Sequence, residues 1–281
     1  MFELSARNAR GDILPLTGNK DFALRATGFN SLTANINTTK SANADGTRKN
    51  SANLNERNIV LYLTLHPPIE LNRNKLYKFF NPKSDVRLFY KNELRDVYID
   101  GTIETFECET FTEKEVAQIS IICNDPYFKS AKDTICEFTN IQPLFKFPFA
   151  IPAAGIPFSE SERETTKTIN HGDVESGVII EFYALTSQIL QPAFYNLTTQ
   201  KYIKLLVDME QGDLIRINTN RGEKSITLTR DGITSNIINS MENGSKWLNL
   251  IAGENRVSYS ADEGQNNLET RLITTNKYMG V

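Results

Sequence analysis

The feature that most constrains the fold is an alternation of apolar and polar residues with a period of two, interrupted by turn-forming residues. Residues 58–65 are rich in β-branched and aromatic residues and end at His66-Pro67-Pro68, which cannot continue a central strand. The same pattern predicts further strands at residues 85–90, 97–106 and 116–123. Each such strand buries one of its faces, so the first half of the chain is predicted to be sheet-based.

One helix is predicted within this run of strands. Residues 69–80 place an apolar set near one face at helical spacing, namely Ile69, Leu71 or Arg73, Leu76, Phe79 and Phe80. Asn81-Pro82 ends the helix. A single helix packed against a sheet is the simplest arrangement that buries its apolar face.

Residues 30–56 differ from their surroundings because they are polar and offer almost nothing to bury. A structureless loop of about 20 residues is uncommon in a compact domain unless it has a function. Two interpretations remain open, a polar arm or long hairpin that reaches a partner, and a loop that is merely mobile. The residues of a subunit-interface arm at 35–53 would be Asn37, Lys40, Asp45, Arg48 and Lys49.

A boundary is predicted near residues 142–157, where four prolines in 16 residues favour an extended crossing segment. The strand pattern then resumes, at residues 165–169, 178–185, 192–198, 202–207, 213–218, 224–229, 253–259 and 269–274. Short strands at this spacing, separated by Gly, Asn and Asp turns, are typical of an antiparallel sandwich. The chain is therefore predicted to hold two mostly-β domains, residues 1–141 and 158–277.

Composition excludes several classes of protein. The 281 residues carry 31 Lys plus Arg against 34 Asp plus Glu, so there is no basic excess to drive nucleic-acid or anionic-membrane binding. The charged N-terminus lacks the apolar stretch of a signal peptide, and no run of about 18 apolar residues predicts a membrane span. We therefore expect synthesis in the cytoplasm, where three widely spaced cysteines fit buried free thiols.

The search for catalytic or metal-binding motifs predicts no catalytic residue, no cofactor and no metal site. The carboxylates cluster near one predicted hairpin, at Glu104, Glu107, Glu109, Glu113 and Glu115. Alternation along a strand separates Glu104 from the face of Glu107 and Glu109, which argues against a paired glycosidase site. A solvated hairpin, or one that meets a basic partner surface, is the better interpretation.

Several segments, in their order and spacing, resemble siphophage distal tail proteins. These are residues 51–60, the helix ending in Tyr77-Lys-Phe-Phe-Asn-Pro82, Tyr98-Ile-x-Gly101, and above all Gln118-Ile-Ser-Ile-Ile-Cys-Asn-Asp-Pro-Tyr-Phe128. In the second half, Gly212-Asp213, Gly222 before residues 224–226, residues 247–255 and the final Tyr278-Met-Gly-Val281 also fit. The resemblance covers nearly the whole chain.

The resemblance implies a non-enzymatic structural protein of the virion tail tip. It implies that the N-terminal domain is a β-sandwich-type ring domain that joins six copies, and that the second domain is a galectin-like or carbohydrate-module-like antiparallel sandwich. It further implies that the homo-hexamer joins the tail-tube protein to the tail-associated fibre or lysin protein and can hold receptor-binding proteins. The family pattern also allows residues 278–281 to return to the first domain.

A competing hypothesis is a carbohydrate-binding module that recognises host cell-wall polysaccharide. Such a module needs stacking aromatic rings beside amide or carboxylate groups on one exposed sandwich face. The residues named for this platform are Trp247, Tyr183 and Tyr195. Flanking Leu248 and Leu250 favour a core position for Trp247 instead.

Overall fold

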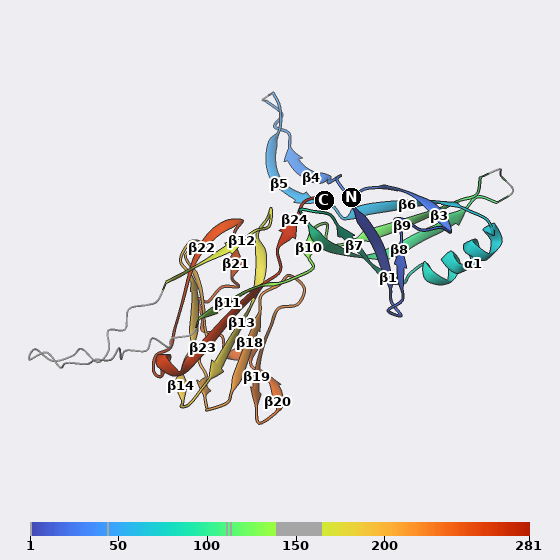
Figure 1. The fold of residues 1–281 in the computed structure, drawn as a ribbon. Coiled ribbons are helices and arrows are strands. Elements are labelled where there is room, and N and C mark those ends of the chain that lie inside the picture. Colours follow the sequence, from blue (N-terminus) through green and yellow to red (C-terminus); the bar gives the residue numbers. More distant parts are fainter. Residues whose placement is uncertain (1, 44, 111, 113, 139–164) are drawn as a thin grey trace, which may run out of the picture. The chain divides into compact units, whose positions relative to one another are not determined.

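The computed structural model describes residues 2–43, 45–110, 112, 114–138 and 165–281. The chain forms two compact units, one of residues 1–132 with 277–281, the other of residues 133–276. Both units are built almost entirely of antiparallel strands (Figure 1), so the predicted mainly-β fold class is confirmed. In the described part of the chain, no helix has the length and apolarity that a membrane span requires.

The first unit is organised around one nine-stranded sheet. Its central path runs in the order β2-β1-β7-β8-β9-β6-β3, and β10 and β24 add to it beside β8. The strands are β1 (Glu3–Asn8), β2 (Ile13–Pro15), β3 (Phe22–Thr27), β6 (Arg57–Leu65), β7 (Asp85–Lys91), β8 (Asp96–Cys108), β9 (Val116–Cys123), β10 (Phe128–Ser130) and β24 (Lys277–Tyr278). The four strands predicted in this half correspond to β6, β7, β8 and β9.

The period-two pattern accounts for the core of this unit. In β6 every second residue from Arg57 to Leu65 is buried, while the residues between them are exposed or half-buried. Ile59, Leu61 and Leu63 are fully buried and pack with the inward residues of β7, β8 and β9. Burial of one face per strand supplies the main apolar stabilisation of the sheet.

Helix α1 (Ile69–Phe79) covers part of this sheet and matches the predicted segment. Leu76 and Phe80 are buried in the core, and Ile69 and Phe79 pack at its margin. Asn72, also buried, donates a hydrogen bond of 2.9 Å to the carbonyl of His66, which satisfies its side-chain amide. The helix is therefore held by both apolar packing and a buried amide.

Residues 277–281 belong to the first unit rather than to the second. Strand β24 pairs with β10, and the carbonyls of Met279 and Gly280 accept hydrogen bonds from Arg57 and Arg95 at 2.6 Å each. The guanidinium of Arg95 also lies 4.5 Å from the centre of the Tyr278 ring. The last residues of the chain thus complete the sheet that the first residues begin.

The second unit is a two-sheet sandwich. One sheet has seven strands, in the order β11-β23-β13-β18-β19-β20 with β21 beside β13, and the other has four, in the order β12-β22-β15-β16. The larger sheet contains β11 (Thr134–Phe138), β13 (Ser176–Ala184), β18 (Leu214–Asn218), β19 (Ser225–Arg230), β20 (Ile233–Asn236), β21 (Asn249–Leu250) and β23 (Leu268–Thr274). The smaller contains β12 (Thr166–Asn170), β15 (Ala193–Asn196), β16 (Lys201–Lys204) and β22 (Gly253–Ser260).

Smaller elements complete this unit: the pair β14 (Ile189–Leu190) and β17 (Asp208–Met209), and two short 3₁₀ turns at Ile238–Ser240 and Gln265–Asn267. The core between the two sheets joins Phe182 of one to Phe194 and Tyr259 of the other. All eight strands predicted in this half are present, and the sandwich is confirmed.

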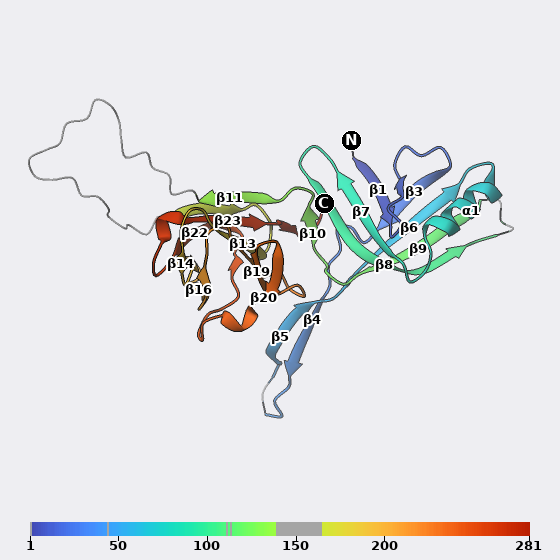
Figure 2. The ribbon, with the colours of Figure 1, turned by 90° about the horizontal axis from the view of Figure 1, so that it is seen from below.

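The units divide the chain differently from the predicted domains at one point. Strand β11 pairs with β23 along its whole length and lies beside it in Figure 2. Its last residue, Phe138, is 4% exposed and packs edge-on against Phe194 and Tyr259. Residues 133–138, which we had assigned to the first domain, therefore belong to the second unit. The predicted crossing segment at 142–157 lies outside the described residues.

Candidate assembly surface

The most exposed element of the first unit is a two-stranded ribbon formed by β4 (Ala34–Thr39) and β5 (Arg48–Leu54) (Figure 1). Every residue of both strands is exposed. Of the two interpretations left open for this segment, the structure therefore shows the hairpin. We call residues 34–54 the arm.

The base of the arm has one apolar and one polar face. Ala34 lies opposite Leu54 and Ile36 opposite Ala52, so these four side chains share one face. Ile36 is 58% exposed and Leu54 is 36% exposed. The other face carries Asn35, Asn37, Ser51 and Asn53. An amphipathic ribbon of only two strands with an uncovered apolar face is marginally stable by itself.

The structure brings the five predicted arm residues onto this one hairpin. Asn37 lies on β4 beside an irregularity in the register, and Arg48 and Lys49 lie on β5 opposite Thr39 and Thr38. Lys40 and Asp45 lie in the connection between the strands. The arm thus carries three cationic side chains and one carboxylate.

A buried arginine fixes the place where the arm leaves the sheet. Arg57, which lies shortly after the arm, is 2% exposed and donates hydrogen bonds to the carbonyls of Gly28 (2.9 Å) and Phe29 (2.5 Å), which lie shortly before the arm. It also donates to the carbonyls of Pro126 (2.7 Å) and Met279 (2.6 Å). Burial lowers the pKa of Arg57, with a smaller opposing effect of Cys123.

Gly28 shows how closely the chain segments approach at this point. A Cβ atom at Gly28 would lie 2.1 Å from the carbonyl oxygen of Asn58, and its φ of +89° is in the region that favours glycine. Both ends of the arm are therefore held tightly, while the arm itself is exposed. No sequence motif marks Arg57 as a positioning residue, and the one signal of its inward direction is its alternation in phase with Ile59 and Leu61.

The nine-stranded sheet leaves an edge at β3. Among the described strands, β3 pairs only with β6, whereas β6 and β9 are hydrogen-bonded on both sides. Subunit contacts are also predicted for residues 59–65 and 116–123; because the backbone groups of these strands are paired within the sheet, such contacts would have to use side chains. A backbone contact with a neighbouring molecule is open to β3 instead.

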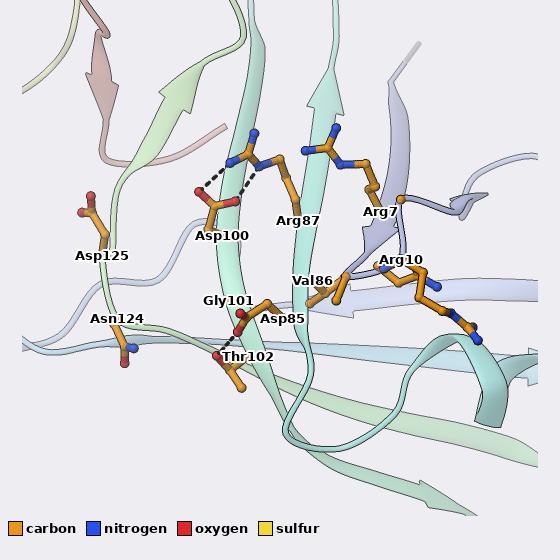
Figure 3. Close-up of a pocket in the computed structure, with 13 residues that line it drawn as sticks. Arg7, Arg10, Asp85, Val86, Arg87, Asp100, Gly101, Thr102, Asn124 and Asp125 are labelled. Carbon is orange, nitrogen blue, oxygen red and sulfur yellow. Dashed lines mark hydrogen bonds and ion pairs between the residues drawn. The ribbon is translucent and has the colours of Figure 1, made fainter. Parts of the chain in front are cut away.

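A charged cleft of about 650 Å³ lies at the other side of this sheet, lined by β1, β7, β8 and residues 124–125 (Figure 3). Arg7, Arg87 and Asp100 form one row across three neighbouring strands. Arg87 and Asp100 point toward each other and form two hydrogen bonds, of 2.5 and 3.1 Å. Burial disfavours the charged form of Arg87, but the hydrogen bond and charge of Asp100 outweigh it and raise the pKa of Arg87.

The cleft offers ion pairs rather than a catalytic set. Asp125 forms ion pairs with Lys277 at 3.1 Å and with Lys129 at 3.6 Å, so the negative charge of its carboxylate is balanced within the chain. Among the described residues, no group of three or more His, Cys, Asp or Glu could hold a metal ion. Cys123 is fully buried, and burial raises its pKa to about 12, which leaves the thiol protonated and unreactive.

The acidic hairpin between β8 and β9 is partly tied into the unit. Glu115 forms an ion pair of 2.8 Å with Arg73 of α1, and Glu104 accepts a hydrogen bond of 2.9 Å from Ser120. Glu107 lies near the end of β8, and Glu109 directly follows the strand. Glu113 lies outside the described residues.

The three residues predicted for a sugar platform lie at three different places in the second unit. Tyr183 is on β13 of the seven-stranded sheet and is 40% exposed, whereas Tyr195 is on β15 of the four-stranded sheet. Trp247 packs partly against the core, as its flanking leucines predict, with the Lys224 ammonium 5.3 Å from its ring centre. A ring that sequence analysis did not select, that of Tyr202, stacks on Tyr195.

Comparison with protein families decides the identity of the chain. Residues 19–123 match the family described as "Phage tail protein RIFT-related domain" and residues 171–278 match "Siphovirus-type tail component, C-terminal domain". The chain belongs to the siphophage distal tail protein family. It is a tail hub or baseplate component with a structural role, and its place is the virion tail. No curated protein sequence matches the chain.

Solved structures share the fold of this distal tail protein at low sequence identity. The Dit (gp 19.1) protein of phage SPP1, described as a paradigm of the hub adsorption apparatus in phages that infect Gram-positive bacteria, has a TM-score of 0.70, 13% identity and 98% coverage of both chains. Chains of the phage P2 baseplate in its activated conformation, with Ca or with Sr, have TM-scores of 0.55 and 0.54 at 12% identity and full coverage.

Proposed function

We propose that this distal tail protein forms a closed ring of six copies at the tail tip, with the arm reaching from each copy to the next. The ring would join the tail-tube protein to the tail-associated fibre or lysin protein and to the receptor-binding apparatus. The observation that carries the proposal is the arm, which is fully exposed on a single chain yet held firmly at its base by Arg57. The hub and baseplate assemblies that share its fold support this assignment.

The apolar face of the arm supports a subunit contact. Burial of Ile36 and Leu54 against a second copy would favour association, since full burial of an apolar side chain of this size contributes about 1.5–3 kcal/mol. In a single chain this face contacts water, so a second copy that covers it would stabilise both the ribbon and the assembly. The free edge of β3 offers a further contact, and in a closed cyclic ring every copy would make the same contact.

The distribution of charge supports a contact between the arm of one copy and the acidic hairpin of the next. The arm carries Lys40, Arg48 and Lys49, whereas the hairpin between β8 and β9 carries Glu107 and Glu109. A basic arm on one copy and an acidic hairpin on the next would attract each other and fix the orientation of neighbouring subunits. The chain would be synthesised in the host cytoplasm, and we propose no catalytic activity.

The test is the mass of the purified protein by light scattering coupled to size exclusion. A ring would have six times the chain mass of 31.8 kDa, about 191 kDa. The triple variant Lys40→Glu, Arg48→Glu and Lys49→Glu should lower this mass while it leaves unfolding of the monomer unchanged.

A matched control carries the same change of charge elsewhere, as Lys132→Glu, Arg221→Glu and Lys246→Glu, three exposed residues outside the arm. The control should keep the mass of the wild-type protein. An intact ring in the arm variant would contradict the role of the arm, and a wild-type mass near 31.8 kDa at all concentrations would contradict spontaneous ring formation.

A further inference from the structure

The outer face of the four-stranded sheet in the second unit presents two tyrosine rings side by side. Phe194 and Tyr259 point into the core, so the residues that alternate with them point outward. Tyr195 on β15 lies directly opposite Tyr202 on β16, and their rings stack with centroids 5.9 Å apart and planes inclined by 24°. Both rings are partly exposed. We call these two residues the tyrosine pair.

The tyrosine pair is bordered by polar groups. The Lys204 ammonium forms hydrogen bonds of 2.7 and 2.8 Å with the carboxylate of Asp262, and the hydroxyl of Ser260 lies 3.4 Å from that of Tyr195. Glu242 is held beside the pair, because its backbone amide donates a hydrogen bond of 2.9 Å to the carbonyl of Lys204. The hydrogen bond between its side chain and Tyr202 is the largest cause of the raised pKa of Tyr202. The border thus contains two carboxylates, one ammonium and hydroxyl groups.

The loop that precedes β21 holds this surface in place. The backbone amide of Lys246 donates a hydrogen bond of 2.8 Å to the carbonyl of Tyr202, and the amide of Lys204 donates one of 3.0 Å to the hydroxyl of Ser245. Leu205 forms a β-bridge with Met241. The edge of β16 is therefore covered, and the tyrosine pair lies on a braced surface rather than on a free edge.

This combination of groups fits one class of ligand. The apolar C–H face of a pyranose packs on an aromatic ring, and its hydroxyls donate to carboxylates and accept from ammonium or hydroxyl groups. The Lys204 ammonium is already matched by Asp262, which reduces its attraction for an anionic polymer. The register neighbours of Tyr195 on this face are small: Ser258 is buried beside it and Ser260 is a half-buried polar residue, so neither adds an apolar surface for a peptide.

We propose that the tyrosine pair, with Asp262 and Glu242, is a binding site for an uncharged saccharide. One sugar ring stacks on the tyrosines, and its neighbouring hydroxyls bond to the two carboxylates. This site adds a recognition activity to the second unit and is independent of ring formation. It replaces the predicted set of Trp247, Tyr183 and Tyr195, of which it keeps Tyr195.

The experiment uses the full chain on an array of neutral oligosaccharides and purified bacterial cell-wall polysaccharides, followed by calorimetric titration of each polysaccharide that binds. We expect saturable binding whose affinity is the same at low and high salt. Tyr195→Ala and Tyr202→Ala should each weaken it by at least about tenfold. Tyr183→Ala, an exposed tyrosine on the other sheet of the same unit, is the matched control and should bind like the wild type.

Asp262→Asn keeps the proposal testable if a tyrosine variant fails to fold, because it removes one charged acceptor from an exposed side chain and leaves both rings. It should also weaken binding. Absence of binding to every saccharide at millimolar concentration overturns the proposal, as does binding that all three variants retain. Binding that weakens steeply with salt would instead indicate an anionic polymer and overturn the assignment to an uncharged ligand. Light scattering tests ring formation and the binding experiments test the saccharide site, so either proposal can fail while the other holds.

Discussion

At the scale of single residues, Arg57 shows what a sequence pattern contains and what it omits. The alternation in β6 places Arg57 in phase with Ile59 and Leu61, so its inward direction was predictable. Its acceptors were not, because Gly28, Pro126 and Met279 lie far from it in the sequence and meet only in the folded unit. A charged side chain is usually expected to be exposed. Here backbone carbonyls replace water around it.

Replacing this arginine should destabilise the first unit alone. Arg57→Met removes the donors to four carbonyls, and we expect a loss of about 3 kcal/mol in the free energy of unfolding. Arg57→Lys keeps the charge but not the planar set of donors, so its loss should be smaller. Urea unfolding followed by far-ultraviolet circular dichroism measures the effect. Trp247 is the only tryptophan and lies in the second unit, so its fluorescence transition should not move. An unchanged dichroism transition would contradict this role of Arg57.

At the scale of elements, strands whose inward residues are large were predictable and the others were not. The sequence predicts β6, β7, β8 and β9 because Ile, Leu and Val alternate in them. In β1 the buried positions are Leu4, Ala6 and Asn8, and such a small and partly polar set gives a weak signal. The arm lies between these cases. Its polar composition predicted exposure, but composition could not decide between a hairpin and a loop, since that depends on cross-strand pairing.

The two faces of the arm should differ in their importance for assembly. Ile36→Asp places a charge on the apolar face and should weaken association between copies by at least about tenfold, because an unpaired carboxylate resists burial. Ile36 is 58% exposed in the single chain, so unfolding of the monomer should hardly change. Asn35→Asp makes the same change of charge on the polar face and serves as the control. Light scattering over a range of concentrations compares the two, and equal effects would show that the apolar face is not the contact.

At the scale of the whole molecule, the fold class and the sandwich were predictable, whereas the limits of the two units were not. The proline-rich stretch at 142–157 suggested that everything before it belongs to the first domain. Strand β11 contradicts that division, because its partner β23 lies more than a hundred residues further along the chain. Such long-range pairing leaves no local signal. The sequence alone also gives no signal that Tyr195 and Tyr202 are neighbours, since only the register of two strands brings their rings together.

The assignment of β11 to the second unit predicts which unit a core substitution will affect. Phe138→Ala removes a ring that packs between Phe194 and Tyr259, and loss of a buried phenylalanine costs about 3–5 kcal/mol. The cost should fall on the sandwich, so the urea midpoint of the Trp247 fluorescence transition should decrease. Phe2→Ala is the control, because Phe2 is a half-exposed ring of the first unit and should leave that midpoint unchanged. If residues 133–138 instead formed part of the first domain, Phe138→Ala would leave the fluorescence transition of Trp247 unchanged. It would then lower only the urea midpoint of the dichroism transition that reports the first unit.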